Sequence, residues 1–289
     1  MSETNHDKIS LTAKLVSYYR QFSDIPFSKD VADYVGAEQA FQNLLAECDL
    51  KSEELLLYAP ILEARYKSIA AQVLKSGITQ VLELASGFSL RGLAVTQNPK
   101  MNYVESDLGD LTHEKPALIS KIRAQHHLKD HGNYYTATAN ALDLEQLREA
   151  VRFFQPHQAL AVVNEGLIQY LSHAEMKILA KNVRELLLEF GGVWITPDFF
   201  IKTDSQNVSE KRKKFRQAVS GVTETEMYAS AFESYDQMDV FFEESGFVRQ
   251  RLNQVKEAGE LVSLKTLGLS PEVVEKLQSG LNLWVLHPR

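Results

Sequence analysis

From Thr79 onward, short apolar runs alternate with longer amphipathic stretches, and this alternation restricts the fold more than any other feature of the sequence. Strands and helices in regular alternation predict a mostly parallel sheet with helices on both of its faces. We interpret seven runs as strands, at residues 79–84, 101–106, 133–138, 160–164, 191–196, 247–252 and 281–287. Helices are expected between strands at residues 114–128, 143–154, 172–189 and 235–245.

Two connections in this part of the chain have features of their own. No helix is obvious between the last two strands, where only residues 271–278 come into question, so we expect an antiparallel pair at the end of the sheet. Residues 198–234 form a long polar insert after the fifth strand, and inserts of that length are often lids or walls of a substrate site. Ser172, with Glu175 three positions later, has the spacing of a capping box at a helix start.

The first 76 residues have a mixed polar and apolar pattern that indicates helices rather than strands. We expect helices at residues 10–22, 29–36, 37–47 and 60–76. Pro26 separates the first two, because the residue before a proline disfavours helix. The chain is therefore divided into an N-terminal helical cap, residues 1–76, and a core, residues 77–289, that contains the insert.

Length and composition are those of an ordinary globular protein. The 289 residues, 44% of them apolar and 24% charged, suit one large α/β domain with added helices. The net charge of −7 disfavours nucleic-acid binding, and the one basic cluster, residues 211–214, is too short to provide such a surface. We expect a cytoplasmic protein with no membrane partner, because the N-terminus is polar and no run approaches the roughly 20 apolar residues that cross a bilayer.

Metal ligands are not expected. The single cysteine excludes an intramolecular disulfide and a cysteine-based metal site. The segment His126-His127-x-x-Asp130-His131 has a composition that suits a metal, but it lies in a polar helix end and no second cluster accompanies it.

The segment from Val81 to Gly92 carries the strongest chemical signal. A buried strand runs into a turn of small residues and then into a helix, so the backbone can approach a ligand closely and the helix presents free N–H groups. In a dinucleotide enzyme such a turn binds pyrophosphate. Glu83, at the end of the strand, would oppose a pyrophosphate, so the turn favours a cationic or neutral ligand.

A second signal lies at the end of the next strand. Glu105 and Asp107 follow the first turn by about 20 residues, where an acidic residue can bind ribose hydroxyls. Both side chains are expected on the same face of the strand, because side chains alternate with a period of two. The alternative is that one or both cap the following helix.

Several segments together resemble one known family. The residues Glu83-Leu-Ala-Ser-Gly-Phe-Ser-Leu-Arg91 and Tyr103-Val-Glu-Ser-Asp107 resemble its strand-to-turn segments, and Asn164-Glu-Gly with Tyr170-Leu171 resembles its segment after the fourth strand. Thr12 to Lys14, Ile25 to Phe27, and Ala64 with Arg65 resemble its N-terminal signatures. The chain is thus similar to class I S-adenosylmethionine (SAM)-dependent methyltransferases of the leucine carboxyl methyltransferase and polyketide O-methyltransferase branch, over roughly residues 10 to 200.

The resemblance implies a fold and a cofactor. The fold would be α/β, with a Rossmann-like seven-stranded, mostly parallel sheet, an antiparallel terminal strand, N-terminal helices and a helical insert or lid. The cofactor would be SAM. A carboxylate such as Glu83 suits this cationic sulfonium compound better than it suits a pyrophosphate.

The resemblance also implies a set of site residues. Lys14 and Arg65 would hold the SAM carboxylate, and Ala85 and Gly87 would line its methionine portion. Asp107 would bind ribose. The remaining implied cofactor-binding residues are Glu83 and Glu105, Asn140 and Ala141 near the adenine, and Glu165 facing the amino acid or sulfonium. Tyr170 and Asp198 are candidates for catalytic or substrate contacts.

Some of these assignments have a structural alternative. Lys14 could be a solvated helix residue, and Arg65 could pair with Glu63 or a surface acid. Tyr170 could belong to the core.

Three positions depart from the family's pattern. Ala85 replaces the first glycine of the turn, which is sterically tolerable only if φ there is negative. Ser89 replaces an aspartate of the turn, and Asn140 replaces another aspartate. Together these changes keep open a protein with weakened SAM affinity or a non-catalytic protein that retains the fold.

The expected reaction is methyl transfer from SAM to a carboxylate or hydroxyl oxygen of a small molecule. A carboxylate is already ionised near neutral pH and needs no general base, whereas a hydroxyl needs one that the sequence does not single out. The alternatives are the non-catalytic protein and methylation of a protein C-terminus. A nicotinamide dehydrogenase is disfavoured, because the turn lacks Gly-x-Gly-x-x-Gly and carries Glu83.

Overall fold

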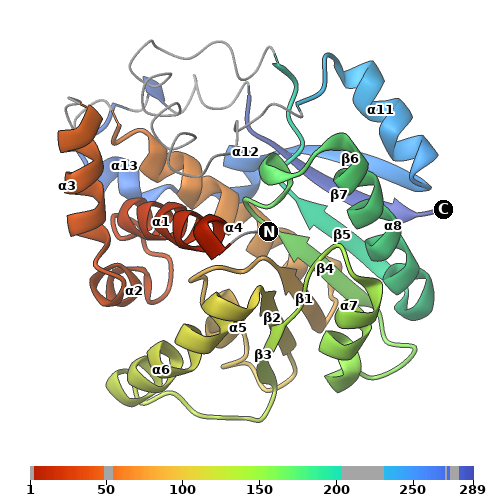
Figure 1. Ribbon diagram of the computed structural model, residues 1–289, viewed down its shortest axis with the longest axis horizontal. Helices are drawn as coiled ribbons and strands as arrows, with labels where there is room; N and C mark the ends of the chain where they lie inside the picture. Colours follow the sequence, from red (N-terminus) through yellow and green to blue (C-terminus); the bar gives the residue numbers. More distant parts are fainter. Residues whose placement is uncertain (1–2, 49–54, 203–230, 271, 274–279) are drawn as a thin grey trace.

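One seven-stranded sheet forms the centre of the protein. The computed structural model describes residues 3–48, 55–202, 231–270, 272–273 and 280–289. The strand order is β3-β2-β1-β4-β5-β7-β6 (Figure 1). The strands are β1 Gln80–Leu84, β2 Asn102–Asp107, β3 Tyr134–Thr138, β4 Leu160–Asn164, β5 Gly192–Thr196, β6 Phe247–Asn253 and β7 Asn282–Pro288.

The strand directions confirm the expected fold class. Strands β1 to β5 run parallel to one another, whereas β7 is antiparallel to both of its neighbours, β5 and β6. Each of the seven strands expected from the sequence is present, with ends that differ by at most one residue.

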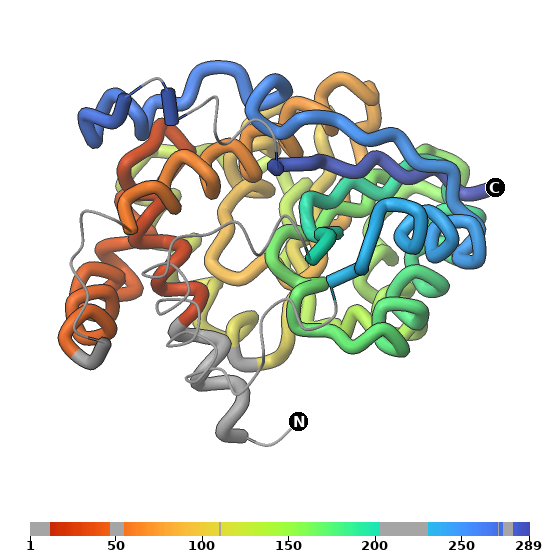
Figure 2. The backbone as a smooth tube through the Cα atoms, turned by 90° about the horizontal axis from the view of Figure 1, so that it is seen from above, coloured from red at the N-terminus to blue at the C-terminus, as the bar shows by residue number. Residues whose placement is uncertain are grey.

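Helices cover both faces of this sheet (Figures 1 and 2). The larger ones are α1 Glu3–Arg20, α2 Ser28–Tyr34, α3 Ala37–Cys48, α4 Tyr58–Ser76, α6 Gly109–Gln125, α7 Leu144–Ala150, α8 His173–Phe190 and α11 Tyr235–Glu244. Three short helices are α5 Arg91–Val95, α12 Gln254–Ala258 and α13 Val262–Thr266. The capping box at the start of α8 is confirmed: the Ser172 hydroxyl accepts the Glu175 N–H, and the Glu175 carboxylate accepts the Ser172 N–H.

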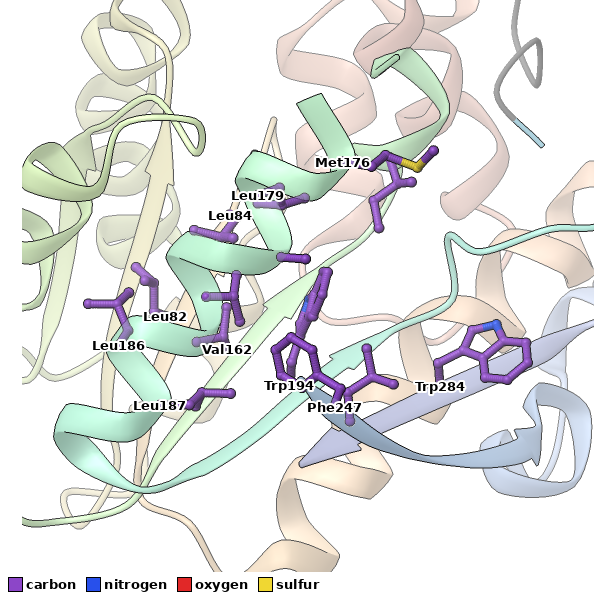
Figure 3. Close-up of a cluster of buried hydrophobic side chains, with 14 of the residues drawn as sticks. Leu82, Leu84, Val162, Met176, Leu179, Leu186, Leu187, Trp194, Phe247 and Trp284 are labelled. Carbon is purple, nitrogen blue, oxygen red and sulfur yellow. The ribbon is translucent and has the colours of Figure 1, made fainter. Parts of the chain in front are cut away.

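Successive strand residues enter different hydrophobic clusters, as the period of two requires. Leu82 and Val162 pack with Leu179 of α8 in one cluster, which Figure 3 shows between that helix and the sheet. Val81, the neighbour of Leu82, packs with Ile69 of α4 in another. Both clusters are almost fully buried, so the sheet is held between layers of helices.

The N-terminal helices have a hydrophobic cluster of their own. Tyr18 of α1 stacks on Phe41 of α3, with ring centroids 3.9 Å apart. Helix α4 joins this cluster through Leu62 and the sheet through Ile69. The expected boundary at residue 76 coincides with the end of α4, although α4 packs against the sheet as well as against the cap. The division into cap and core stays a prediction.

The connection between β6 and β7 corrects an expectation. We expected no helix there, but α12 and α13 both lie in it. Each has only five residues, too few for an apolar repeat to show in the sequence. Their first turns are stabilised by side chains instead: Asn253 accepts the Lys256 N–H, and Glu63 of α4 accepts the N–H groups of Val262 and Ser263.

Most of the expected insert, residues 203–230, lies outside the described residues. Its two ends are described, and a parallel β-bridge joins Ile201 to Phe232. Its role as a lid stays a prediction. None of the helices in the described part of the chain has the length and apolar character to span a membrane.

Candidate functional site

A cavity of about 210 Å³ lies at the carboxyl ends of the parallel strands. Strand β1 pairs with β2 on one side and with β4 on the other, so the order of strands along the chain reverses at β1. Open α/β sheets bind ligands at such a reversal. Helices α1 and α4 also contribute to its walls. The lining of this main cavity comprises Thr12, Ala13, Val16, Ser17, Arg20, Leu62, Arg65, Glu83, residues 85–89, Asp107, Leu108, Leu111, residues 139–142, residues 165–167 and residues 169–171.

The turn after β1 has a backbone conformation that we did not expect. Ala85 has φ = +51°, and Gly87 has φ = +53°. The requirement for a negative φ at Ala85 was wrong. The left-handed conformation costs an L-residue about 1–2 kcal/mol. Surrounding contacts hold the turn: the Ser86 N–H donates to the Ser106 carbonyl at 3.0 Å, and the Ser86 hydroxyl accepts from buried Lys115 at 2.8 Å.

Asp107 ties the turn after β1 to the end of β2. Its carboxylate accepts the Gly87 N–H at 2.6 Å and the Leu108 N–H at 2.8 Å. Burial raises the pKa of the Asp107 carboxyl above its usual value, although these two N–H groups act in the opposite direction. Each carboxylate oxygen keeps a lone pair that can face the cavity, so the residue suits a ribose diol.

Glu105 takes a different position from Asp107. It does not line the main cavity but lies fully buried, 2.5 Å from Lys115 Nζ, and accepts the Gly92 N–H at 2.7 Å. Tyr134 also donates its hydroxyl to this carboxylate. Both Glu105 and Asp107 were expected to bind the cofactor, but only Asp107 lines the main cavity. Glu105 stabilises the start of α5 instead.

Helix α1 brings Arg20, rather than Lys14, to the cavity. Ala13, Val16, Ser17 and Arg20 all line it, with the i, i+3, i+4, i+7 spacing of one helix face. Lys14 lies off this face and does not line the cavity. Arg20 was not expected in the site. Its spacing of seven from Ala13 places both on one helix face, but only the docking of α1 shows that this face lines the cavity.

Glu165, directly after β4, is held between two arginines. Arg20 Nη2 lies 2.6 Å from Glu165 Oε1, and Arg91 Nη2 lies 2.9 Å from Glu165 Oε2. Burial alone would raise the pKa of the Glu165 carboxyl, but the guanidinium groups of Arg20 and Arg91 hold that pKa below its usual range. Its contribution to stability is therefore present at neutral pH and is lost only as the pH falls through this lowered pKa.

Arg91 extends this network behind the cavity. It is almost completely buried, and its Nε lies 3.3 Å from Glu83 Oε1. It also donates to the Tyr66 carbonyl, and its guanidinium lies 3.9 Å from the centre of the Tyr66 ring. The Tyr103 hydroxyl donates to the second oxygen of Glu83 at 2.8 Å. Glu83 thus reaches the cavity wall as a paired carboxylate.

Arg65 lines the main cavity and pairs with Asp198 at 2.5 Å, so its partner is neither Glu63 nor a surface acid. Asp198 does not line the main cavity. It is buried beneath the loop after β4 and accepts the N–H groups of Gly166 and Leu167. Asp198 therefore positions this loop, and of the two catalytic candidates only Tyr170 faces the main cavity.

The remaining candidates lie at the end of β3. Asn140 and Ala141 both line the main cavity. The Asn140 side-chain oxygen accepts the Leu142 N–H at 3.0 Å, which shapes the loop as a turn. Within the described residues, no three His, Cys, Asp or Glu side chains come together as metal ligands. His126 instead lies 2.9 Å from the Asp30 carboxylate.

These residues fit SAM. The cofactor carries ribose hydroxyls, a carboxylate, and cationic ammonium and sulfonium groups. The cavity offers a carboxylate at Asp107, the guanidinium groups of Arg20 and Arg65, and the carboxylates Glu83 and Glu165. The buried Nε of Arg20 has no hydrogen-bond partner in the described protein, so a donor remains for a ligand anion.

Comparison with solved structures supports the fold. A DUF574 family protein from Streptomyces avermitilis MA-4680 is 12% identical, has a TM-score of 0.60, and is matched over 96% of this chain and 97% of that one. The methyltransferase domain of bacterial CtHen1 is also 12% identical, with a TM-score of 0.50 over 78% of this chain and 97% of that domain. At such low identity these similarities establish the fold alone.

Sequence comparison establishes the family. No curated protein matches the sequence. The profile described as leucine carboxyl methyltransferase matches residues 38–184, just over half of the chain, and this range includes the turn after β1, Asp107 and Glu165. The protein therefore belongs to the leucine carboxyl methyltransferase family and is a SAM-dependent methyltransferase.

Proposed function

We propose that the protein transfers a methyl group to a carboxylate or hydroxyl oxygen of a small molecule. The observation that carries this proposal is the composition of the main cavity, where apolar side chains such as Val16, Leu62 and Leu171 share one enclosure with the cofactor-binding groups. Apolar walls with a few placed polar groups are typical of small-molecule sites.

The chain's own residues divide the work of holding the cofactor. Asp107 binds the ribose, and Asn140 with Ala141 borders the adenine. Arg20 and Arg65, which both line the main cavity, hold the carboxylate, and the Arg20 Nε is a donor that its ion pair with Glu165 does not use. Arg20 thus takes the part that the family resemblance implied for Lys14. Bound SAM supplies an electrophilic methyl group.

The lining favours an acceptor that is already ionised. The described residues that line the main cavity include no histidine, and Glu165 is held as an anion because Arg20 and Arg91 lower the pKa of its carboxyl. A carboxylate acceptor needs no proton removed before it attacks. Positioning and exclusion of water from the enclosure then supply most of the rate.

The test uses SAM with a labelled methyl group and a panel of small carboxylic acids, phenols and peptides. Mild base hydrolyses methyl esters and releases labelled methanol, whereas methyl ethers keep the label, so one treatment separates the two kinds of acceptor. We expect label on small acceptors and a large loss of product in Asp107→Asn. Label confined to peptide C-termini would contradict the proposal in favour of protein carboxyl methylation. SAM binding without product on any acceptor would favour a non-catalytic protein.

A further inference from the structure

Gln169 lines the main cavity, and its side chain carries a buried polar atom. Gln169 belongs to the short 3-10 helix η3, Ile168–Tyr170, which follows β4, and only 9% of its surface is exposed. Its side-chain oxygen is buried and accepts no hydrogen bond within the described protein. Leaving such an acceptor unpaired costs free energy, and buried polar groups are nearly always satisfied. A ligand is therefore the natural partner.

The loop that carries Gln169 is held in place. The Asp198 carboxylate accepts the backbone N–H groups of Gly166, Leu167 and Ile168, just before Gln169. Asp198 itself is anchored by Arg65 and by the side chain of Asn164. A side chain on so constrained a loop keeps its position when no ligand is bound, as recognition of a specific group requires.

The sheet order places Gln169 on the side of β1 opposite to Asp107 and Asn140. Asp107 and Asn140 follow β2 and β3, which lie on one side of β1, whereas η3 follows β4 on the other side. Gln169 also lines a smaller neighbouring cavity together with Phe199 and Phe232, at the described ends of the insert. It therefore faces apolar surroundings away from the residues that border the nucleoside.

We propose that Gln169 determines acceptor specificity by accepting a hydrogen bond from an O–H or N–H group of the methyl acceptor, a group other than the oxygen that is methylated. The acceptor class is thus an apolar molecule that carries a neutral hydrogen-bond donor. The Thr12 hydroxyl is also buried, and it has no hydrogen-bond partner among the described residues. Since Thr12 lines the cavity, it offers the same molecule a second polar contact. This inference rests on the proposed function, because it concerns the acceptor of that reaction.

The experiment compares Gln169→Met, which keeps the shape of the side chain but removes its oxygen, with the matched variant Gln80→Met. Gln80 is also a buried glutamine, but its amide donates to the carbonyls of Gln155 and Gln158 and accepts the Gln155 N–H. We expect Gln80→Met to lower the melting temperature by roughly 4 °C or more. Gln169→Met should leave it unchanged or raise it, because no internal hydrogen bond is lost.

The ligand part uses two probes that share one apolar body. 6-Hydroxy-2-naphthoic acid donates a hydrogen bond from its hydroxyl, whereas 6-methoxy-2-naphthoic acid does not, and both keep a carboxylate for the methyl-acceptor position. The affinity of each is measured by calorimetry with S-adenosylhomocysteine bound. We expect wild type to prefer 6-hydroxy-2-naphthoic acid by roughly 5- to 100-fold. Gln169→Met should reduce this ratio to near one, and Gln169→Glu, which keeps acceptor oxygens, should retain a preference.

Three results would overturn the assignment of Gln169. They are a loss of melting temperature in Gln169→Met as large as in Gln80→Met, equal affinity of wild type for both probes, and no binding of either probe. S-adenosylhomocysteine binding is measured separately. Its absence in wild type would contradict the proposed function itself, whereas its presence together with any of these three results would overturn only the specificity proposal.

Discussion

The two sides of the main cavity are built by different chemistry. On the side of β1 and β2, Asp107 is held by the backbone N–H groups of Gly87 and Leu108. On the side of β4, Glu165 is held by Arg20 and Arg91, which lie 145 and 74 positions away in the sequence. The contacts of the first side therefore come from consecutive strands of one sheet and the turns that follow them. The second side also requires helix α1 to pack against the cavity, because α1 carries Arg20.

The two carboxylates also differ in how firmly they remain ionised. Burial raises the pKa of Asp107, because neutral N–H groups compensate its charge only in part. The pKa of Glu165 is lowered, because cationic partners outweigh burial. On the β4 side, Glu165 thus remains ionised within a network of ion pairs. On the β2 side, Asp107 is protonated more readily as the pH falls and then loses its negative charge.

Removing the centre of the ionic side has the largest expected effect. Arg91→Met leaves Glu83 and Glu165 without their shared buried partner, and breaking a buried ion pair costs about 3–5 kcal/mol. Urea unfolding measures the loss. The control is Lys177→Met, whose exposed pair with Glu244 contributes less than about 1 kcal/mol. Equal losses of the free energy of unfolding in the two variants would show that the buried network stabilises the protein no more than an exposed ion pair does.

Changing the β2 side should affect the cofactor more than the fold. Asp107→Asn is expected to weaken SAM binding by roughly 10- to 100-fold, since hydrogen bonds to a charged group are lost. Calorimetry measures this. Because the pKa of Asp107 is raised, wild-type affinity should fall as the pH drops toward that pKa, and Asp107→Asn should lose this dependence.

Glu105→Gln, two positions earlier, serves as the comparison for Asp107→Asn. It should lower stability through Lys115 but change SAM affinity little. The reverse order of affinities would reassign the ribose ligand to Glu105.

The smallest effect concerns the turn between the two sides. Ala85→Gly relieves the left-handed conformation of an alanine and should raise the free energy of unfolding by about 0.5–1 kcal/mol. Ala40→Gly, within the regular helix α3, should lower it by about 1 kcal/mol. Destabilisation by both substitutions would mean that the Ala85 methyl group makes contacts worth more than the strain that it causes.

Local signals were sufficient to predict most of the fold. The buried runs that became β1 and β4 and the capping box of Ser172 and Glu175 are properties of short stretches, and the structure confirms them. The helices α12 and α13 could not be predicted in this way. Their stabilising contacts include Glu63, about 200 positions away along the chain.

The residues of the site also differ in whether nearby sequence or distant contacts determine their position. Asp107 was expected in the site from its place at the end of a strand and Glu165 from the family resemblance, and both line the main cavity. Glu105 was misplaced, because its position in the strand does not reveal that Lys115 and Tyr134 enclose it. Arg20 was missed, because a helix face acquires meaning only when the helix is docked.

The sequence by itself determined the order of strands and helices, the acidic ends of β1, β2 and β4, and the family, since these depend on residues close together in the chain. Only the tertiary structure decided which charges meet. It paired Arg20 and Arg91 with Glu165, placed Asp198 beneath the loop after β4, and left the buried Gln169 oxygen without a hydrogen-bond partner among the described residues. The physical reason is that a buried charge or dipole takes its role from the neighbours that replace water around it, and packing brings those neighbours from distant parts of the chain.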